Sequence, residues 1–188
     1  MSTPQRMTAD DLLSYDARGR RTELVRGRLV VREPASYRQG AVAARVLARL
    51  AAWLEADREQ RHASRPRGEL LAADTGFMLQ RGPDTVRAPD VAFVLWEHRP
   101  TVTRGFPDMA PDLAVEVLSP DDRPAAVLAK VADWLGAGTS LVWTIDVERR
   151  RAAVHRADGS ITVVAEHESL DGETLLPGLR IALVPLLD

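Results

Sequence analysis

The apolar runs of this sequence predict strands, and two of them contain an acidic residue where a covered side chain is expected. The run over residues 111–118, Pro-Asp-Leu-Ala-Val-Glu-Val-Leu, is apolar at both alternating positions, which is typical of a central strand covered on both faces. Glu116 lies in the middle of this run. Because side chains alternate along a strand, Glu116 shares its face with Ala114 and Leu118, on a surface otherwise built to be covered.

A second run, over residues 86–95, repeats this pattern around Asp90. We expect one strand here, in which Asp90 lies on the same face as Val86, Ala92 and Val94. An unpaired carboxylate at such a position is strongly unfavourable. Two acids on neighbouring covered strands therefore suggest that they share a cation.

A helix is predicted after these strands, over residues 123–135. Asp122 and Pro124 are typical of a helix start, and Gly136 is typical of a helix end. Its apolar stripe is formed by Val127, Leu128, Val131, Trp134 and Leu135. This stripe predicts that the helix packs on the sheet.

Lys130 lies at the margin of this stripe, from which its stem could carry the ammonium over the end of the sheet. Lysine and arginine together number 25, and Lys130 is the only lysine. Because lysine is a compact charge that can sit beside a metal-bound water, the composition favours a role for the ammonium itself. The alternatives are a solvated helix residue for Lys130, turn chemistry after Pro89 for Asp90, and a buried salt bridge to an arginine for Glu116.

The rest of the pattern predicts further helices and strands around these elements. We expect helices over 8–14 and 36–56, a hairpin over 23–31, a strand over 69–79, a turn over 81–84, strands over 141–145, 151–155 and 161–165, and a C-terminal segment over 175–187 that covers a sheet edge.

Composition narrows the function classes. With 188 residues and 45% hydrophobic content, the chain suits one globular domain over residues 1–188. It has no cysteine, no signal-peptide pattern and no apolar run of the roughly 18–20 residues that a membrane span needs, so we expect a cytoplasmic protein. A net charge of -2 argues against nonspecific coating of nucleic acid, but it is compatible with an enzyme that has a local basic rim.

The order of these residues resembles the Uma-type putative restriction endonuclease family of the PD-(D/E)xK nuclease superfamily. The likeness consists of Pro89-Asp90, then Glu116 in an apolar strand followed by Ser119-Pro120, then a lysine on the next helix. Residues 22–30 look like the opening hairpin of that family, 111–120 like its signature strand and 141–146 like its late strand. One departure is that the superfamily places lysine two residues after the acid, where this chain has Leu118; its counterpart here is Lys130.

The resemblance implies an α/β fold, with a restriction-endonuclease-like mixed central sheet flanked by helices and β-hairpin additions at the N- and C-terminal ends. It also implies a catalytic set of Asp90, Glu116 and Lys130, with Glu23 as an auxiliary metal or water ligand. For Glu23 the alternative is an exposed acid that pairs with an arginine. The oxygen donors of Asp90, Glu116 and the Val117 backbone carbonyl suit Mg²⁺ or Mn²⁺.

The predicted function is a metal-dependent endonuclease, with DNA as substrate because the resemblance points to DNA. In such an enzyme the ion would polarise a phosphoryl oxygen and activate water, and Lys130 would stabilise negative charge. One alternative is a catalytically silent member of the fold that serves binding or dimerisation, against which the intact acid-acid-lysine set weighs. A second is a hydrolase of RNA or of small phosphodiesters. We also expect a homodimer, because cutting both strands of a duplex commonly needs two sites.

Overall fold

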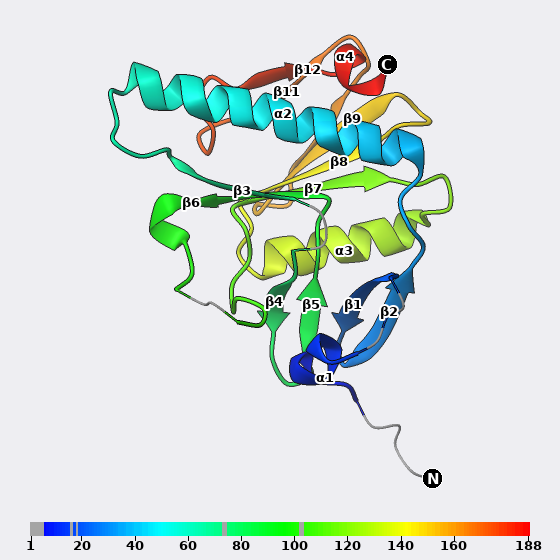
Figure 1. Ribbon diagram of the computed structural model, residues 1–188. Helices are drawn as coiled ribbons and strands as arrows, with labels where there is room; N and C mark the ends of the chain where they lie inside the picture. The colour runs from blue at the N-terminus through cyan, green and yellow to red at the C-terminus, as the bar shows by residue number, and fades with distance from the viewer. Residues whose placement is uncertain (1–5, 16, 18, 73–74, 102–103) are drawn as a thin grey trace.

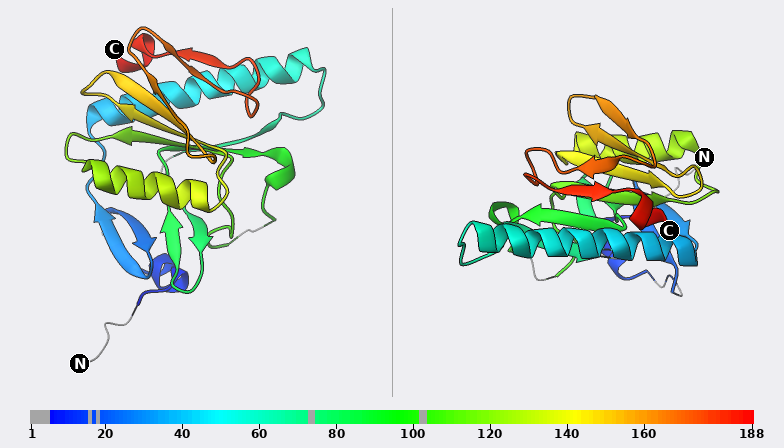
Figure 2. Two further views of the ribbon diagram at one scale, coloured as in Figure 1. Left: turned by 180° about the vertical axis from the view of Figure 1, so that it is seen from behind. Right: turned by 90° about the horizontal axis from the view of Figure 1, so that it is seen from above.

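The computed structural model describes residues 6–15, 17, 19–72, 75–101 and 104–188, and its elements lie in layers (Figure 1). A six-stranded sheet lies between helix α2 (Tyr37–Gln60) on one face and helix α3 (Pro124–Gly136) on the other. A four-stranded sheet lies beyond α3, so that α3 lies between the two sheets. The same order of layers is seen from behind (Figure 2).

The strands of the six-stranded sheet, in spatial order, are β10 (Ile161–Val164), β9 (Arg151–Arg156), β8 (Leu141–Asp146), β7 (Leu113–Leu118), β6 (Val91–Leu95) and β3 (Gly68–Ala72). Those of the four-stranded sheet are β2 (Arg28–Arg32), β1 (Arg21–Val25), β5 (Thr85–Arg87) and β4 (Phe77–Gln80). The smaller elements are α1 (Ala9–Leu13), the 3-10 helix η1 (Trp96–His98), the strand pair β11 (Ser169–Asp171) and β12 (Arg180–Ala182), and α4 (Val184–Leu187).

The large sheet is mixed. Strands β7 and β8 pair in parallel, whereas β6 pairs with β7 and β8 with β9 in the antiparallel sense. The parallel pair requires a crossover connection, and α3 provides it. The α/β fold with a mixed central sheet flanked by helices, as expected from the sequence, is thereby confirmed. None of the helices in the described ranges is both long and apolar enough to cross a membrane.

Helix α2 begins at a capping box in which the Ser36 hydroxyl accepts the Gln39 backbone N–H and the Gln39 side chain accepts the Ser36 N–H. Its buried stripe of Val42, Val46 and Leu50 recurs every four residues and packs on the large sheet. The helix runs to Gln60, four residues beyond the predicted end, because residues 57–60 include no glycine or proline that would end it.

The C-terminal segment packs on a sheet face and not on a sheet edge, so that prediction was wrong. Leu176, Leu183 and Leu186 are buried in the same core as the stripe of α2. The guanidinium of Arg45 on α2 donates to the Leu186 carbonyl at 3.0 Å. Seven apolar side chains between Leu170 and Leu187 are buried in this core, and a sheet face offers far more apolar surface for them than an edge strand.

The predicted strand over 86–95 is two strands that belong to different sheets. Strand β5 ends at Arg87 in the four-stranded sheet, and β6 begins at Val91 in the six-stranded sheet. Pro89 lies at the break, where it cannot donate a hydrogen bond to either sheet. The expected strand over 69–79 is likewise divided into β3 and β4. Asp90 therefore lies at the point where the chain passes from one sheet to the other.

Two glycines test this packing. A Cβ at Gly68 on β3 would collide with the Val94 carbonyl and the Phe93 ring, whereas Gly40 in α2 faces open space. We expect Gly68→Ala to destabilise the protein by about 1–3 kcal/mol and Gly40→Ala to stabilise it by about 0.5–1 kcal/mol. Urea unfolding of both variants measures the difference. Equal stabilities would contradict the pairing of β3 with β6.

Candidate active site

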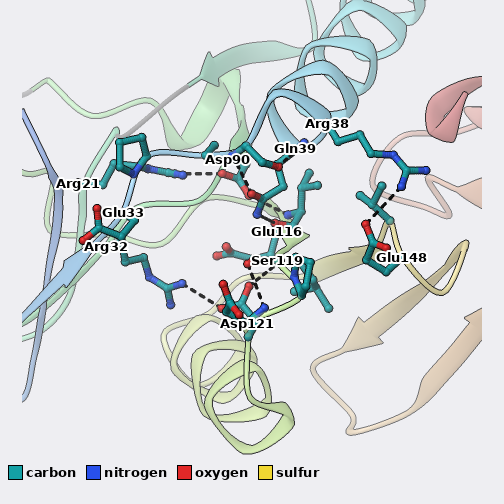
Figure 3. A pocket seen from close by; sticks show the side chains of 18 of the residues that line it. Arg21, Arg32, Glu33, Arg38, Gln39, Asp90, Glu116, Ser119, Asp121 and Glu148 are labelled. Carbon is teal, nitrogen blue, oxygen red and sulfur yellow. Dashed lines mark hydrogen bonds and ion pairs between the residues drawn. The ribbon is translucent and has the colours of Figure 1, made fainter.

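A cavity of about 800 Å³ opens at the end of β7, bounded by the first turn of α2 and by α3 (Figure 3). Asp90, Glu116, Val117 and Lys130 all line it. Glu23 does not line the cavity. The structure thus brings four of the five residues predicted for the site to one cavity.

Asp90 and Glu116 lie opposite each other on neighbouring segments. Val91 pairs with Val115 in the antiparallel register of β6 and β7, which places the preceding Asp90 opposite Glu116. The Asp90 backbone N–H donates to the Val115 carbonyl at 3.0 Å, and its carboxylate accepts the Val117 N–H at 2.7 Å. The other Asp90 oxygen accepts from the Arg21 guanidinium at 3.0 Å.

Lys130 is buried, and its ammonium lies between two carboxylates. Its Nζ is 2.7 Å from Glu116 Oε2 and 2.8 Å from Glu23 Oε1, and it donates to the Ala88 carbonyl at 3.0 Å. An ammonium has three N–H donors, so these contacts use all of them. The ammonium lies beside the cavity at the end of β7, but it is buried, because β1 of the four-stranded sheet brings Glu23 against it.

Glu23 joins this cluster from β1. It is only 3% exposed, so the alternative of an exposed acid does not hold, although Glu23 does pair with arginine. Arg87 Nη1 donates to it at 2.8 Å, Arg32 Nε lies 3.6 Å away, and the Ala88 backbone N–H donates at 3.2 Å. Glu23 therefore does not face the cavity, but it contacts Lys130, which does.

Burial and the neighbouring charges shift the pKa values of Glu23, Glu116 and Lys130. Burial alone would raise the pKa of Glu23, but Lys130 and Arg87 outweigh it and lower the pKa to about 2. Burial raises the pKa of Glu116 to about 7, because Lys130 opposes burial while Asp90 and Glu23 add to it. Burial alone would lower the pKa of Lys130, but Glu116 and Glu23 raise it. Lys130 therefore stays protonated at neutral pH.

Trp134 contacts Glu116 in a way that the sequence did not reveal. It is fully buried, and its indole Nε1 donates to Glu116 Oε1 at 2.8 Å. Its ring also packs edge-on against Phe77, with 6.1 Å between ring centroids. The apolar stripe predicted only the packing, since nothing in a helical pattern distinguishes an indole that also donates a hydrogen bond. Arg87 was overlooked too, although an arginine inside an apolar run was a usable signal.

The oxygens lining the cavity fit a hard divalent cation. Glu116 Oε2 accepts from Lys130 and Oε1 accepts from Trp134, and a carboxylate offers about four lone-pair sites, so Glu116 keeps capacity for a metal. The Val117 carbonyl accepts from the Gln39 amide at 3.3 Å and has a second lone pair. Within the described ranges no three His, Cys, Asp or Glu side chains form a group that could hold a metal ion. The candidate ligands are therefore two carboxylates and one carbonyl, a set suited to Mg²⁺ or Mn²⁺.

Comparison with known proteins gives a family and a fold. Residues 9–184 match the family model described as "Uma2: Putative restriction endonuclease". No curated protein matches this chain. Among solved structures, the chain is similar to a putative nuclease belonging to DUF820 from Anabaena variabilis ATCC 29413, with a TM-score of 0.79 and 18% identity over 96% of this chain and 97% of that one. At this identity the likeness shows a common fold.

The lowered pKa of Glu23 predicts how stability depends on pH. Its fall from an ordinary 4.5 to about 2 corresponds to about 3 kcal/mol of stability that is present above pH 4.5 and is lost as the pH falls towards 2. We therefore expect Glu23→Gln to be clearly less stable than the wild type at pH 7. The difference should shrink as the pH falls below 4.5, because the carboxyl then becomes protonated in the unfolded chain while it stays ionised in the folded protein down to about pH 2. Thermal unfolding between pH 7 and 2.5 measures it.

Glu69→Gln is the matched control for this prediction. It makes the same change of charge at an exposed ion pair, in which Arg99 Nε lies 2.8 Å from Glu69. Exposed pairs contribute up to about 1 kcal/mol, so this variant should change little at any pH. Equal losses in the two variants would show that Glu23 is not held by the buried charges.

Proposed function

The chain belongs to the Uma2 family of putative restriction endonucleases, and on that premise we propose that it is a metal-dependent endonuclease that hydrolyses phosphodiester bonds of DNA. Family and fold support nuclease activity, and with it a nucleic acid as substrate. The observation that carries the finer proposal is the placement of Asp90 opposite Glu116 in a cavity, with the Lys130 ammonium bonded to Glu116.

The charges around the cavity support the need for a cation. Its lining contains six acidic and four basic residues, a formal excess of two negative charges when every acid, Glu116 included, is ionised. The acidic residues are Glu33, Asp90, Glu116, Asp121, Asp122 and Glu148, and the basic ones are Arg21, Arg32, Arg38 and Lys130. A phosphodiester is itself an anion, so this lining alone would repel it. One divalent ion would neutralise the excess.

We assign the metal-binding role to Asp90, Glu116 and the Val117 carbonyl. A divalent ion held there would supply Lewis-acid polarisation of a phosphoryl oxygen and a lower pKa for a bound water. Hydrolysis forms a bond from the water oxygen to phosphorus and breaks one phosphorus–ester oxygen bond. Trp134 and Lys130 each hold one Glu116 oxygen, and Arg21 holds one Asp90 oxygen, so both carboxylates are oriented before substrate binds.

In this proposal Lys130 is an electrostatic group and not a base. Because Glu116 and Glu23 raise its pKa, its ammonium has no free site to accept a proton from water. It can stabilise negative charge that develops near Glu116. Direct contact with the reacting oxygen would require Lys130 to give up one of its three acceptors.

The proposal is tested with purified protein and a panel of single-stranded DNA, duplex DNA, RNA and a small phosphodiester. Each is incubated with Mg²⁺, with Mn²⁺ and with a chelator. DNA cleavage that the chelator abolishes is the expected result. Cleavage of RNA alone, or of the small diester alone, would show that this compound and not DNA is the substrate. Failure to cleave any member of the panel would favour a catalytically silent module.

Metal binding should depend on both acids. We expect Asp90→Asn and Glu116→Gln each to lose most of the Mn²⁺ affinity while the fold survives, because each removes an anionic oxygen from the ligand set. Isothermal titration calorimetry measures the affinity. The matched control is Asp121→Asn, which removes an equal charge from an exposed residue of the same lining and should keep binding. Unchanged affinity in both acid variants would place the metal elsewhere.

Lys130→Arg should keep the charge and lose turnover. A guanidinium is larger and planar, so it cannot fill the position of a compact ammonium between Glu23 and Glu116. We expect at least a tenfold lower single-turnover rate at saturating Mg²⁺, with about 1–3 kcal/mol lost in stability because the site is enclosed. Rates are compared well below the melting temperature of the variant.

Arg32→Lys provides the comparison for Lys130→Arg. Arg32 also lines the cavity, but its side chain is about a third exposed, so a lysine there should be tolerated. A Lys130→Arg enzyme that cleaves within a few-fold of the wild type would remove the ammonium from the mechanism.

A further inference from the structure

Tyr37 is the large hydrophobic side chain that the fold leaves most open to solvent. It is 93% exposed, the highest value among the exposed large hydrophobic residues of the described ranges. It also lines the cavity that holds Asp90 and Glu116. The other exposed residues of this kind, such as Leu128, Ile161 and Tyr15, do not line it.

The backbone that carries Tyr37 is fixed to the candidate active site. Tyr37 is the first residue of α2, directly after the N-cap Ser36. Gln39, two residues later, accepts the Ser36 N–H at 2.9 Å and donates to the Val117 carbonyl on β7 at 3.3 Å. The capping box and this contact hold the first turn of α2 against the strand that bears Glu116. The backbone at Tyr37 is therefore held beside the cavity, and its ring is exposed to solvent there.

Two arginines lie at the same opening, each paired with an acidic residue of the lining. Arg38 extends from α2 and pairs with Glu148 at 3.2 Å, and both are about half exposed (Figure 3). Such an exposed pair contributes up to about 1 kcal/mol, so a phosphate could replace Glu148 at little cost. Arg32 also lines the cavity, bonded at 3.3 Å to Asp122. An aromatic ring among arginines is the combination with which proteins bind single-stranded nucleic acids.

We propose that Tyr37 is a stacking platform for an unpaired nucleobase, and that the preferred substrate is single-stranded DNA whose phosphate enters the cavity. This inference rests on the proposed nuclease function and names its substrate class. In a duplex both faces of a base are covered by its neighbours, so only an unpaired base can lie on the ring. The Glu116 and Lys130 side chains are only 11% and 8% exposed, so a flexible strand reaches them more readily than a rigid duplex.

The test is binding of labelled oligonucleotides to the full chain, measured by fluorescence anisotropy with Ca²⁺ in place of Mg²⁺ and with the oligonucleotides checked for integrity. We expect Tyr37→Ala to bind single-stranded DNA at least about fivefold more weakly than the wild type. Tyr37→Phe keeps the ring and should stay within about twofold. Tyr15→Ala, at the other tyrosine of the chain, is the matched control and should bind like the wild type.

An oligonucleotide series with one abasic position identifies the stacked base. The wild type should lose affinity when that base is absent, and Tyr37→Ala should be indifferent to its loss, because the stacking partner is already gone. This readout separates stacking from a general change in folding or charge.

Different outcomes would overturn different conclusions. If the wild type cleaves DNA with Mg²⁺ but Tyr37→Ala binds single strands equally well, the stacking inference is wrong and the nuclease function stands. The same holds if Tyr37→Ala weakens duplex and single-strand binding equally, or if the wild type prefers duplex. If the wild type neither binds nor cleaves any DNA, the proposed function and this inference both fail.

Discussion

The structure depends on one ammonium buried between two carboxylates. Lys130 on α3 contacts Glu116 on β7 of the large sheet and Glu23 on β1 of the small sheet, so one side chain connects three layers. Removing these charges from water is costly, and the cost is offset only where the partners are close and the remaining hydrogen bonds are made. Arg87 and Trp134 complete those bonds, the first on Glu23 and the second on Glu116.

The passage of the chain between the two sheets makes this arrangement possible. Within four residues, Arg87 pairs with Glu23, Ala88 contacts both Glu23 and Lys130, and Asp90 reaches the end of β7. A continuous strand could not do this, because alternate side chains would point to opposite faces of one sheet. Pro89 ends the pairing of β5, and the chain then passes to the large sheet. Asp90 at this passage lines the cavity and is not covered within a sheet.

The same cluster divides the two carboxylates into different roles. Glu23 is surrounded by cations, so it stays ionised and serves to hold Lys130 and Arg87 in place. Glu116 shares the Lys130 ammonium with Glu23 and lies beside the acid Asp90, so its negative charge is only partly compensated. Its raised pKa shows that its negative charge is disfavoured without a further cation, and the lining of the cavity has more acidic than basic residues. Stability and the proposed activity thus draw on the same buried charges.

The sequence by itself determined the two central strands, the helix that carries the lysine, and the candidate acids. Continuous apolar runs predicted β7 and β8, a helical pattern predicted α3, and the position of Glu116 inside its run predicted that it is covered, because each pattern depends on residues a few places apart. The lone lysine indicated Lys130 through composition. Only the tertiary structure decided that Glu23 lies under Lys130, that Trp134 donates to Glu116, that residues 86–95 divide between two sheets and that the C-terminal leucines pack beside α2. These contacts join residues that are far apart in the chain, and their partners are fixed by how the sheets pack around α3, which no local pattern encodes.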